Sequence, residues 1–253
     1  MNVIIITGAS SGMGREFALQ MDAGFTNVDE FWLIARRQDA LEQLAKEMSH
    51  KVRILAMDVT DEYAMDDLEQ LLYEEDVTVR VLVNCAGYGL IGKFEDLDME
   101  GQLGMLTTNC EGLTRLTYLC LPYMRPNSRV INLASSAAFM PQSGFAVYAA
   151  TKAYVMSLSR ALNNELYKKH IYVTAVCPGP VDTAFFDIAE KGGEMLAIKK
   201  YVMATPEAVV DKALRDSYFK KEVSVYSLPM KLFWWWSKLV PHKLILLFLR
   251  GLR

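Results

Sequence analysis

Short apolar runs alternate with amphipathic stretches along the chain. The apolar runs are rich in β-branched residues and predict strands, whereas the stretches between them repeat their apolar positions with a helical period. The predicted strands cover residues 3–7, 30–35, 51–59, 80–85, 129–134, 171–177 and 222–227. The predicted helices cover residues 13–23, 38–48, 62–75, 99–124, 148–168 and 206–219. Thr205 followed by Pro206 is a typical helix start.

Strands that are apolar along their whole length are typical of sheets covered on both faces. Their alternation with helices predicts an α/β fold: a single doubly wound Rossmann-type domain with a mostly parallel, seven-stranded sheet flanked by helices. We expect residues 1–230 to form this dinucleotide-binding and catalytic domain, with a substrate lid at about residues 184–204. Residues 231–253 are expected to form an amphipathic, helical C-terminal extension.

Composition and charge narrow the classes of function. The chain has 253 residues, of which 52% are hydrophobic and 23% charged, as in a globular domain. Its net charge of −3 provides no basic field that would attract nucleic acid. The four cysteines form no C-x-x-C pair and only three histidines are scattered along the chain, so we expect no metal site. Buried, reduced thiols are typical of a cytoplasmic protein.

The two ends of the chain differ. The first apolar run, residues 3–6, is too short for a signal peptide or a membrane span. Residues 231–253 carry five Lys and Arg and no acid, whereas the other 230 residues carry 22 basic and 30 acidic side chains. Three consecutive tryptophans with flanking lysines suit peripheral membrane contact. A contact between subunits and a roof over an apolar substrate explain the same residues equally well, so all three interpretations stay open.

A glycine-rich turn, Thr-Gly-Ala-Ser-Ser-Gly-Met-Gly, follows the first strand directly. Glycines at the junction of a strand and a helix permit a tight turn and a close approach of the backbone to a pyrophosphate. The helix that begins there offers free N–H groups to the phosphates. An ordinary loop is the alternative. The residues we expect to hold the cofactor phosphates are Gly8, Ser10, Ser11, Gly12, Met13 and Gly14.

The second predicted strand is followed by two arginines, Arg36 and Arg37. A site that selects NAD(H) usually places an acid here to bind the ribose 2′-hydroxyl, whereas an arginine can bind a 2′-phosphate with two hydrogen bonds. The alternative is a pair of solvated loop charges. Arg36 therefore favours NADP(H), and NAD(H) is the less expected cofactor.

Further motifs follow in a fixed order. They are Asn-Cys-Ala-Gly at 84–87, Asn109, Ser135, Tyr-Ala-Ala-Thr-Lys at 148–152 and Pro-Gly-Pro-Val-Asp-Thr at 178–183. Together with the glycine-rich turn, they make residues 3 to about 185 resemble the short-chain dehydrogenase/reductase family. Tyr148 and Lys152 are four residues apart, so they share one face of a helix.

The resemblance implies a catalytic set of Asn109, Ser135, Tyr148 and Lys152. Tyr148 would protonate the substrate oxygen in reduction and take the proton back in oxidation. Lys152 would bind the nicotinamide ribose and, together with the positive ring of the cofactor, lower the pKa of Tyr148 from near 10 towards about 7. Ser135 would polarise the substrate oxygen, with Ser136 as the rival assignment. Asn109 would hold a water that relays protons to Lys152.

The resemblance also implies further contacts. Asp58 and Val59 would lie at the adenine, and Asn84, Ala86 and Gly87 at the ribose and nicotinamide. Pro178, Gly179, Val181 and Thr183 would fix the nicotinamide amide. For the substrate, the aromatic residues Phe139, Phe145, Phe185 and Phe186 indicate an apolar pocket, although packing of the lid and core explains them equally well.

These features predict an NADP(H)-dependent oxidoreductase that interconverts a ketone or aldehyde and its alcohol. The expected substrate is an apolar small molecule such as a hydroxysteroid. A 3-oxoacyl or general carbonyl reductase is the alternative enzyme. A sensor or scaffold that binds NADP(H) without turnover is the alternative outside enzymology, and the complete catalytic set argues against it. We expect a cytoplasmic homo-oligomer, a dimer or tetramer, with membrane association through residues 231–253 left open.

Overall fold

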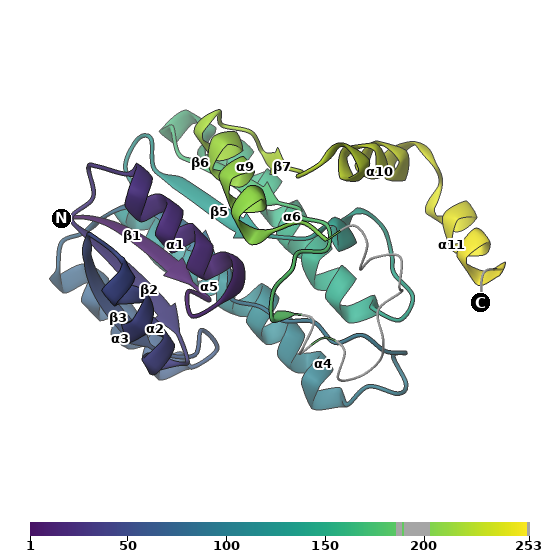
Figure 1. The fold of residues 1–253 in the computed structure, drawn as a ribbon, viewed down its shortest axis with the longest axis horizontal. Helices are drawn as coiled ribbons and strands as arrows, with labels where there is room; N and C mark the ends of the chain where they lie inside the picture. The colour runs from purple at the N-terminus through teal and green to yellow at the C-terminus, as the bar shows by residue number, and fades with distance from the viewer. Residues whose placement is uncertain (186–188, 190–202, 252–253) are drawn as a thin grey trace.

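The computed structural model describes residues 1–185, 189 and 203–251. In this part of the chain, one parallel sheet has the strand order β3-β2-β1-β4-β5-β6-β7 (Figure 1). The strands are β1 (Asn2–Thr7), β2 (Glu30–Ala35), β3 (Lys51–Ala56), β4 (Thr78–Asn84), β5 (Arg129–Leu133), β6 (Tyr172–Val176) and β7 (Val223–Ser224). The predicted doubly wound, seven-stranded sheet is confirmed, although β7 is shorter than the apolar run that predicts it.

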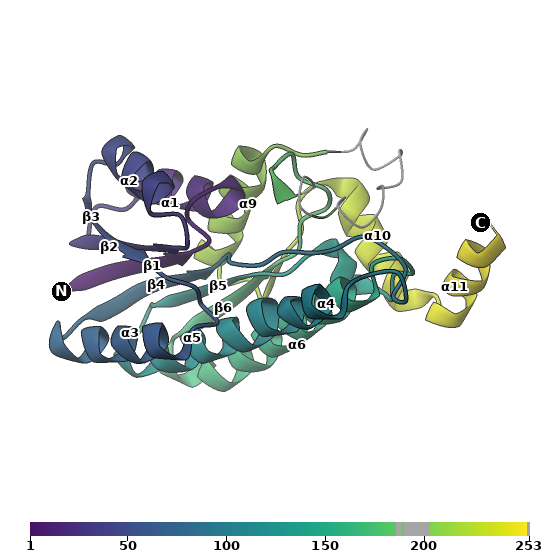
Figure 2. The ribbon, with the colours of Figure 1, turned by 90° about the horizontal axis from the view of Figure 1, so that it is seen from below.

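Helices cover both faces of this sheet, with α1, α2 and α9 on one face and α3, α5 and α6 on the other (Figure 2). The longer helices are α1 (Gly12–Gly24), α2 (Gln38–Glu47), α3 (Glu62–Glu74), α4 (Met99–Leu106), α5 (Leu113–Cys120), α6 (Ala146–Leu166), α9 (Pro206–Tyr218), α10 (Leu228–Leu239) and α11 (His242–Gly251). The predicted start of α9 is confirmed, because the Thr205 hydroxyl accepts a hydrogen bond from the Ala208 N–H.

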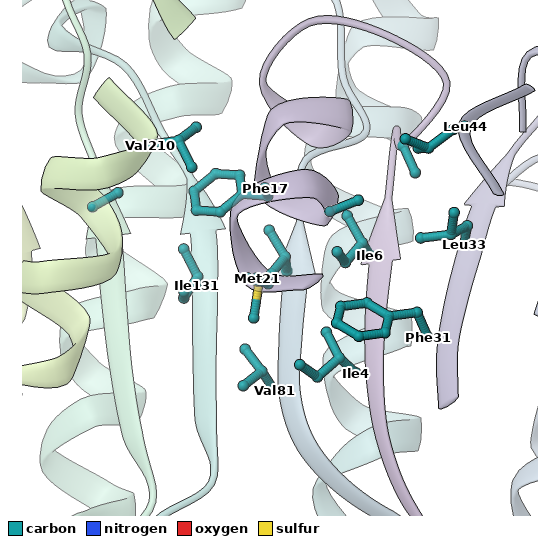
Figure 3. Close-up of a cluster of buried hydrophobic side chains, with 14 of the residues drawn as sticks. Ile4, Ile6, Phe17, Met21, Phe31, Leu33, Leu44, Val81, Ile131 and Val210 are labelled. Atoms are coloured by element: carbon teal, nitrogen blue, oxygen red, sulfur yellow. The ribbon is translucent and has the colours of Figure 1, made fainter. Parts of the chain in front are cut away.

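The alternation of side chains along each strand divides the core into two layers. Ile4 and Ile6 of β1 point toward α1, where they pack with Phe17 and Met21 (Figure 3). Ile5, between them, belongs to the cluster on the opposite face. Both faces of the central strands are therefore buried, which is why these strands read as uninterrupted apolar runs.

One predicted helix is interrupted. The sequence predicts a single helix over residues 99–124, and the structure instead inserts a π-helical turn, Thr107–Gly112, between α4 and α5. Gly112 at its end lies against the Val59 carbonyl, where an added Cβ would come within 2.9 Å of the oxygen. Asn109 lies inside the turn, which re-aims its side chain toward the loop after β4. Such single π turns often occur at functional sites.

The chain after β7 leaves the sheet as α10 and α11, which carry the C-terminus away from the α/β domain (Figures 1 and 2). Helix α10 begins at Leu228, so the expected boundary between residues 230 and 231 lies inside one helix. Among residues 1–185, 189 and 203–251, none of the helices combines the length and the apolar character of a membrane span.

The contact between the end of β1 and the start of α1 generates a prediction. A Cβ on Gly14 would lie 2.3 Å from the Gly8 carbonyl oxygen, and Gly8 itself has a φ of +65°. Gly14→Ala should therefore push α1 off the turn and lower the free energy of unfolding by about 1–3 kcal/mol, as measured by denaturant titration. Gly24→Ala, at the other end of α1, is the matched control because nothing lies within 4 Å of its added Cβ. Equal stability of the two variants would contradict the close contact.

Candidate active site

A cavity of about 780 Å³ opens where the carboxyl ends of the strands meet. This is the expected ligand site of a doubly wound sheet, and its volume lies in the range of cofactor pockets. The cavity is lined by most of the residues predicted to bind the cofactor, namely Gly8, Ser10, Ser11, Gly12, Met13, Gly14, Arg36, Asp58, Val59, Ala86, Gly87, Pro178, Gly179, Val181 and Thr183.

The glycine-rich turn has the shape that a dinucleotide requires. Gly8 and Gly12 both have positive φ values, of +65° and +53°, which side chains other than glycine rarely adopt. The Ser11 hydroxyl makes no capping bond to α1, so the first turn of this helix presents its N–H groups and positive dipole to the cavity. The residues present thus fit a pyrophosphate at this end of the cavity.

The two arginines after β2 occupy different positions. The Arg36 side chain is 77% exposed and its Nη1 lies 3.6 Å from Oδ2 of Asp58. Arg37 instead donates through Nη2 to the carbonyl and the hydroxyl oxygens of Ser10, at 3.1 and 3.2 Å. Arg36 thus lies beside the cavity with its guanidinium accessible, while Arg37 supports the glycine-rich turn.

Helix α6 brings Tyr148 and Lys152 into the cavity, where both are almost fully buried. Lys152 Nζ donates a 2.7 Å hydrogen bond to the Leu133 carbonyl at the end of β5 and lies 5.6 Å from the centre of the Tyr148 ring. Ser135, two residues beyond Leu133, forms a hydrogen bond with the Tyr148 side chain. This bond favours Ser135 over Ser136 as the partner of the tyrosine.

Burial shifts the pKa values of this pair in opposite directions. Burial raises the pKa of Tyr148 to about 12, and the hydrogen bond with Ser135 offsets this only in part. Burial lowers the pKa of Lys152 to about 8. Both shifts follow from the cost of placing a charge in an apolar environment. The groups of the protein alone therefore do not lower the pKa of Tyr148. The expected shift towards 7, which also relies on the positive charge of the bound cofactor, stays a prediction.

Two aromatic side chains enclose Tyr148. Phe145 stacks on its ring with a centroid separation of 4.2 Å, and Phe185 lies against it at 5.4 Å. Both line the cavity, as predicted for substrate contacts. Gly89 completes the enclosure, because a Cβ there would lie 2.6 Å from the tyrosine ring. Phe186 lies outside the described residues.

Phe139 is not where the substrate hypothesis places it. Its side chain is buried against Phe233 and Trp234 of α10, with ring centroids 5.9 and 6.1 Å away, and it does not line the cavity. The physical reason is the apolar inner face of α10, which covers the short helix that contains Phe139. This residue is a packing contact.

Asn84 also departs from its predicted role as a cofactor contact. Its side chain is buried and donates to Thr117 Oγ1 and Asn132 Oδ1, at 2.9 and 2.8 Å. It therefore ties β4 to β5 and α5 beneath the cavity, and it is absent from the cavity lining. The neighbouring residues Ala86 and Gly87 provide the lining instead.

Asn109 uses its side chain to hold the loop after β4. Its Oδ1 accepts the Tyr88 N–H at 3.0 Å, and its Nδ2 donates to the Tyr88 carbonyl at 2.9 Å and to Thr151 Oγ1 at 3.0 Å. The Thr151 hydroxyl in turn donates to the Tyr148 carbonyl. These bonds engage both ends of the amide, so the side chain positions the loop and α6. The expected role of Asn109 in holding a water is compatible with these bonds and stays a prediction.

The structure adds two cavity residues that the sequence does not single out, Met230 and Phe233 of α10. Met230 lies over Gly179, where an added Cβ would come within 2.9 Å of the methionine sulfur. The apolar run near the C-terminus was the only sequence feature that pointed to these two residues. It does not indicate which of its side chains face the cavity.

Comparison with known proteins agrees with this geometry. A family model described as short chain dehydrogenase matches residues 2–192. NADP-dependent 3-hydroxy acid dehydrogenase YdfG from Escherichia coli (strain K12) is 31% identical over 239 residues, which cover 90% of this chain and 94% of that protein. Sulfoacetaldehyde reductase 2 from Chromohalobacter salexigens is 33% identical over 219 residues, with 84% and 85% covered.

Solved structures give the same result. A short-chain dehydrogenase from Sphingobium yanoikuyae in complex with NADPH superposes with a TM-score of 0.78 at 30% identity, covering 90% of this chain and 89% of that chain. The family match, the sheet order and the converging tyrosine, lysine and serine all point the same way. The chain is a member of the short-chain dehydrogenase family of oxidoreductases.

Proposed function

We propose that the protein interconverts a ketone or aldehyde and its alcohol, with NADP(H) as the redox partner and Tyr148 as the proton donor and acceptor. The observation that carries this proposal is the convergence of Tyr148, Lys152 and Ser135 in the cavity that also contains the glycine-rich turn. A dinucleotide and a reacting carbonyl would thus lie next to a protonated tyrosine.

The residues have complementary parts in the reaction. When bound, NADPH supplies a hydride to the carbonyl carbon, and in its oxidised form the nicotinamide carries a positive charge. Tyr148 gives its phenolic proton to the substrate oxygen, and Ser135 donates a hydrogen bond to the same oxygen. Lys152 stabilises the tyrosinate that remains. Oxidation of the alcohol runs through the same groups in reverse.

NADP(H) is the preferred cofactor. The YdfG relative is NADP-dependent by name, and the Sphingobium structure contains NADPH. In this chain, the exposed guanidinium of Arg36 beside the cavity can bind the 2′-phosphate that distinguishes NADP(H) from NAD(H). Asp58 forms an ion pair with this guanidinium at 3.6 Å and leaves most of it exposed.

The substrate side of the cavity supports an apolar carbonyl compound, with hydroxysteroids as our leading class. Among the described lining residues, the basic side chains are Arg36, Arg37 and Lys152, and all three belong to the cofactor loops or the catalytic pair. Among these described residues, an anionic substrate would thus lack a cationic partner of its own. Phe145, Phe185 and Phe233 offer apolar walls instead.

A 3-oxoacyl or general carbonyl reductase is the second candidate. By their names, the two relatives mentioned above act on a 3-hydroxy acid and on sulfoacetaldehyde. Both compounds are anionic and smaller than a steroid. A panel of steroid ketones, 3-oxoacyl thioesters and small aldehydes separates the two candidates.

The proposal predicts the behaviour of Tyr148→Phe. With NADPH oxidation followed by absorbance, the wild type should turn over the apolar ketones of this panel. The variant should lose about 10²- to 10⁴-fold in kcat/KM, because the proton donor is gone. Its affinity for NADPH should stay within about twofold, because an oxygen is removed without loss of a charge.

Tyr154→Phe is the matched control for this experiment. It lies on the same helix, is partly exposed and shares its hydroxyl with Thr114 rather than with the cavity. Its activity should equal that of the wild type. Tight NADPH binding without turnover of any carbonyl by the wild type would contradict the enzyme proposal and favour a sensor.

A second prediction concerns the pH dependence of alcohol oxidation. This direction needs deprotonated Tyr148, so kcat/KM should rise with pH. Lys152→Met removes the cation 5.6 Å from the tyrosine ring and should raise the apparent pKa of this limb by one to two units, or about 10- to 100-fold in rate at neutral pH. Lys168→Met is the control, because Lys168 is exposed and lies just after the end of α6. It should leave the apparent pKa of this limb unchanged. An unshifted limb in Lys152→Met would show that the lysine does not tune the tyrosine.

A third prediction tests cofactor choice. Arg36→Ala should raise the Kd for NADPH by about tenfold or more, since it removes charged hydrogen bonds to the 2′-phosphate, and should leave the Kd for NADH nearly unchanged. Arg37→Ala is the comparison, because it removes the hydrogen bonds to Ser10 in the glycine-rich turn. It should weaken the binding of NADPH and of NADH to the same degree. Fluorescence titration measures all four constants. Parallel weakening in Arg36→Ala would mean that this residue does not select the cofactor.

A further inference from the structure

Helix α10 presents apolar side chains on two opposite faces. Its inner face consists of Met230, Phe233, Trp234 and Ser237; the first two line the cavity, and Phe233 and Trp234 pack on Phe139. With about 3.6 residues per turn, the residues on the far side of the helix form a second stripe. We call this the outer stripe, and it consists of Leu228, Leu232, Trp235 and Leu239.

The outer stripe is exposed over its whole length. Leu232, Trp235 and Leu239 are 61%, 64% and 74% exposed, and Trp236 beside them is also exposed. The apolar surface continues into α11, where Leu244 and Leu247 are exposed. A helix with apolar side chains on two opposite faces normally buries both of them. The outer stripe therefore needs a partner.

The charges next to the stripe identify that partner. Lys231 and Lys238 are two turns apart and flank the stripe along one side, and Lys238 Nζ lies 3.9 Å from the centre of the Trp234 ring. Residues 223–253 contain no Asp or Glu, while the rest of the chain has an excess of acids. Two copies of this face would bring lysines together without a carboxylate, because a two-fold contact pairs a surface with itself. A surface with negative headgroups over an apolar interior matches both features.

We propose that α10 and α11 bind flat on an anionic lipid bilayer through the outer stripe and its flanking lysines. Leucines and tryptophans would enter the interface between headgroups and acyl chains, while the lysines reach the phosphates. The acidic α/β domain is repelled by such a surface, which turns the tail toward the membrane and the domain away from it. This surface goes beyond the proposed reaction and does not depend on it.

Co-sedimentation of the full-length protein with vesicles tests the proposal. We expect binding to phosphatidylcholine vesicles that contain roughly one-third phosphatidylserine, and weaker binding to phosphatidylcholine alone. Leu232→Ser combined with Trp235→Ser should lower the partition coefficient at least about tenfold. Lys231→Gln combined with Lys238→Gln should lower it about tenfold or more on the anionic vesicles only.

Tyr63→Ser is the matched control, because Tyr63 is 84% exposed on α3 and lies outside the tail. It should bind vesicles like the wild type. NADPH affinity and the melting temperature of each variant verify that the domain is intact. Equal sedimentation of the wild type and the Leu232/Trp235 variant would overturn the proposal. So would a dimer in sedimentation velocity that this variant abolishes while the wild type ignores vesicles, because the stripe would then bind a second copy.

Discussion

The common direction of the strands is the constraint on which the site depends. Every strand pair in the described sheet is parallel, so the carboxyl ends of β1, β2, β4, β5 and β6 open on one edge. The loop after each strand contributes one element of the cavity: the glycine-rich turn, the arginines, the Ala86–Gly87 wall, Ser135 and the Pro178–Gly179 segment. Antiparallel pairing would send alternate loops to the opposite edge. The parallel topology of the sheet thus brings the residues of the site together on one edge.

Burial of Tyr148 and Lys152 affects the protonation states that the proposed reaction needs. A tyrosine with a pKa of about 12 keeps its proton at every physiological pH, and this is the form that reduction uses. A lysine with a pKa of about 8 is charged at neutral pH and can meet the tyrosinate when it forms. Oxidation needs the tyrosine to lose its proton first, which the buried environment opposes. The positive charge of bound NADP⁺ would stabilise the tyrosinate and so reduce that cost.

The sequence predicts strands β1, β2 and β6 well because they are buried on both faces and therefore largely apolar. The glycine-rich turn is equally readable, since only glycine fits at Gly8 and Gly14. Predictions fail where an orientation depends on a distant element. Asn84 stands at the predicted strand end, but its bonds to Thr117 and Asn132 turn it beneath the cavity. The π turn that contains Asn109 was not predicted either, because no period in the sequence marks its extra residue.

The inward face of α10 is another feature that the sequence alone does not predict and that contacts with the domain determine. A run of Leu-Phe-Trp-Trp-Trp has apolar side chains all round a helix, so periodicity alone cannot select the inward face. Two packing contacts with the domain set the rotation of α10 about its axis. Phe233 and Trp234 pack on Phe139, and Met230 occupies the space beside Gly179 that a side chain would otherwise fill. Gly179 therefore both lines the cofactor cavity and provides the contact surface for α10. Once these contacts fix the inner face, helical geometry dictates which leucines and which tryptophan face outward. The exposed apolar stripe follows from the same packing that closes the cavity.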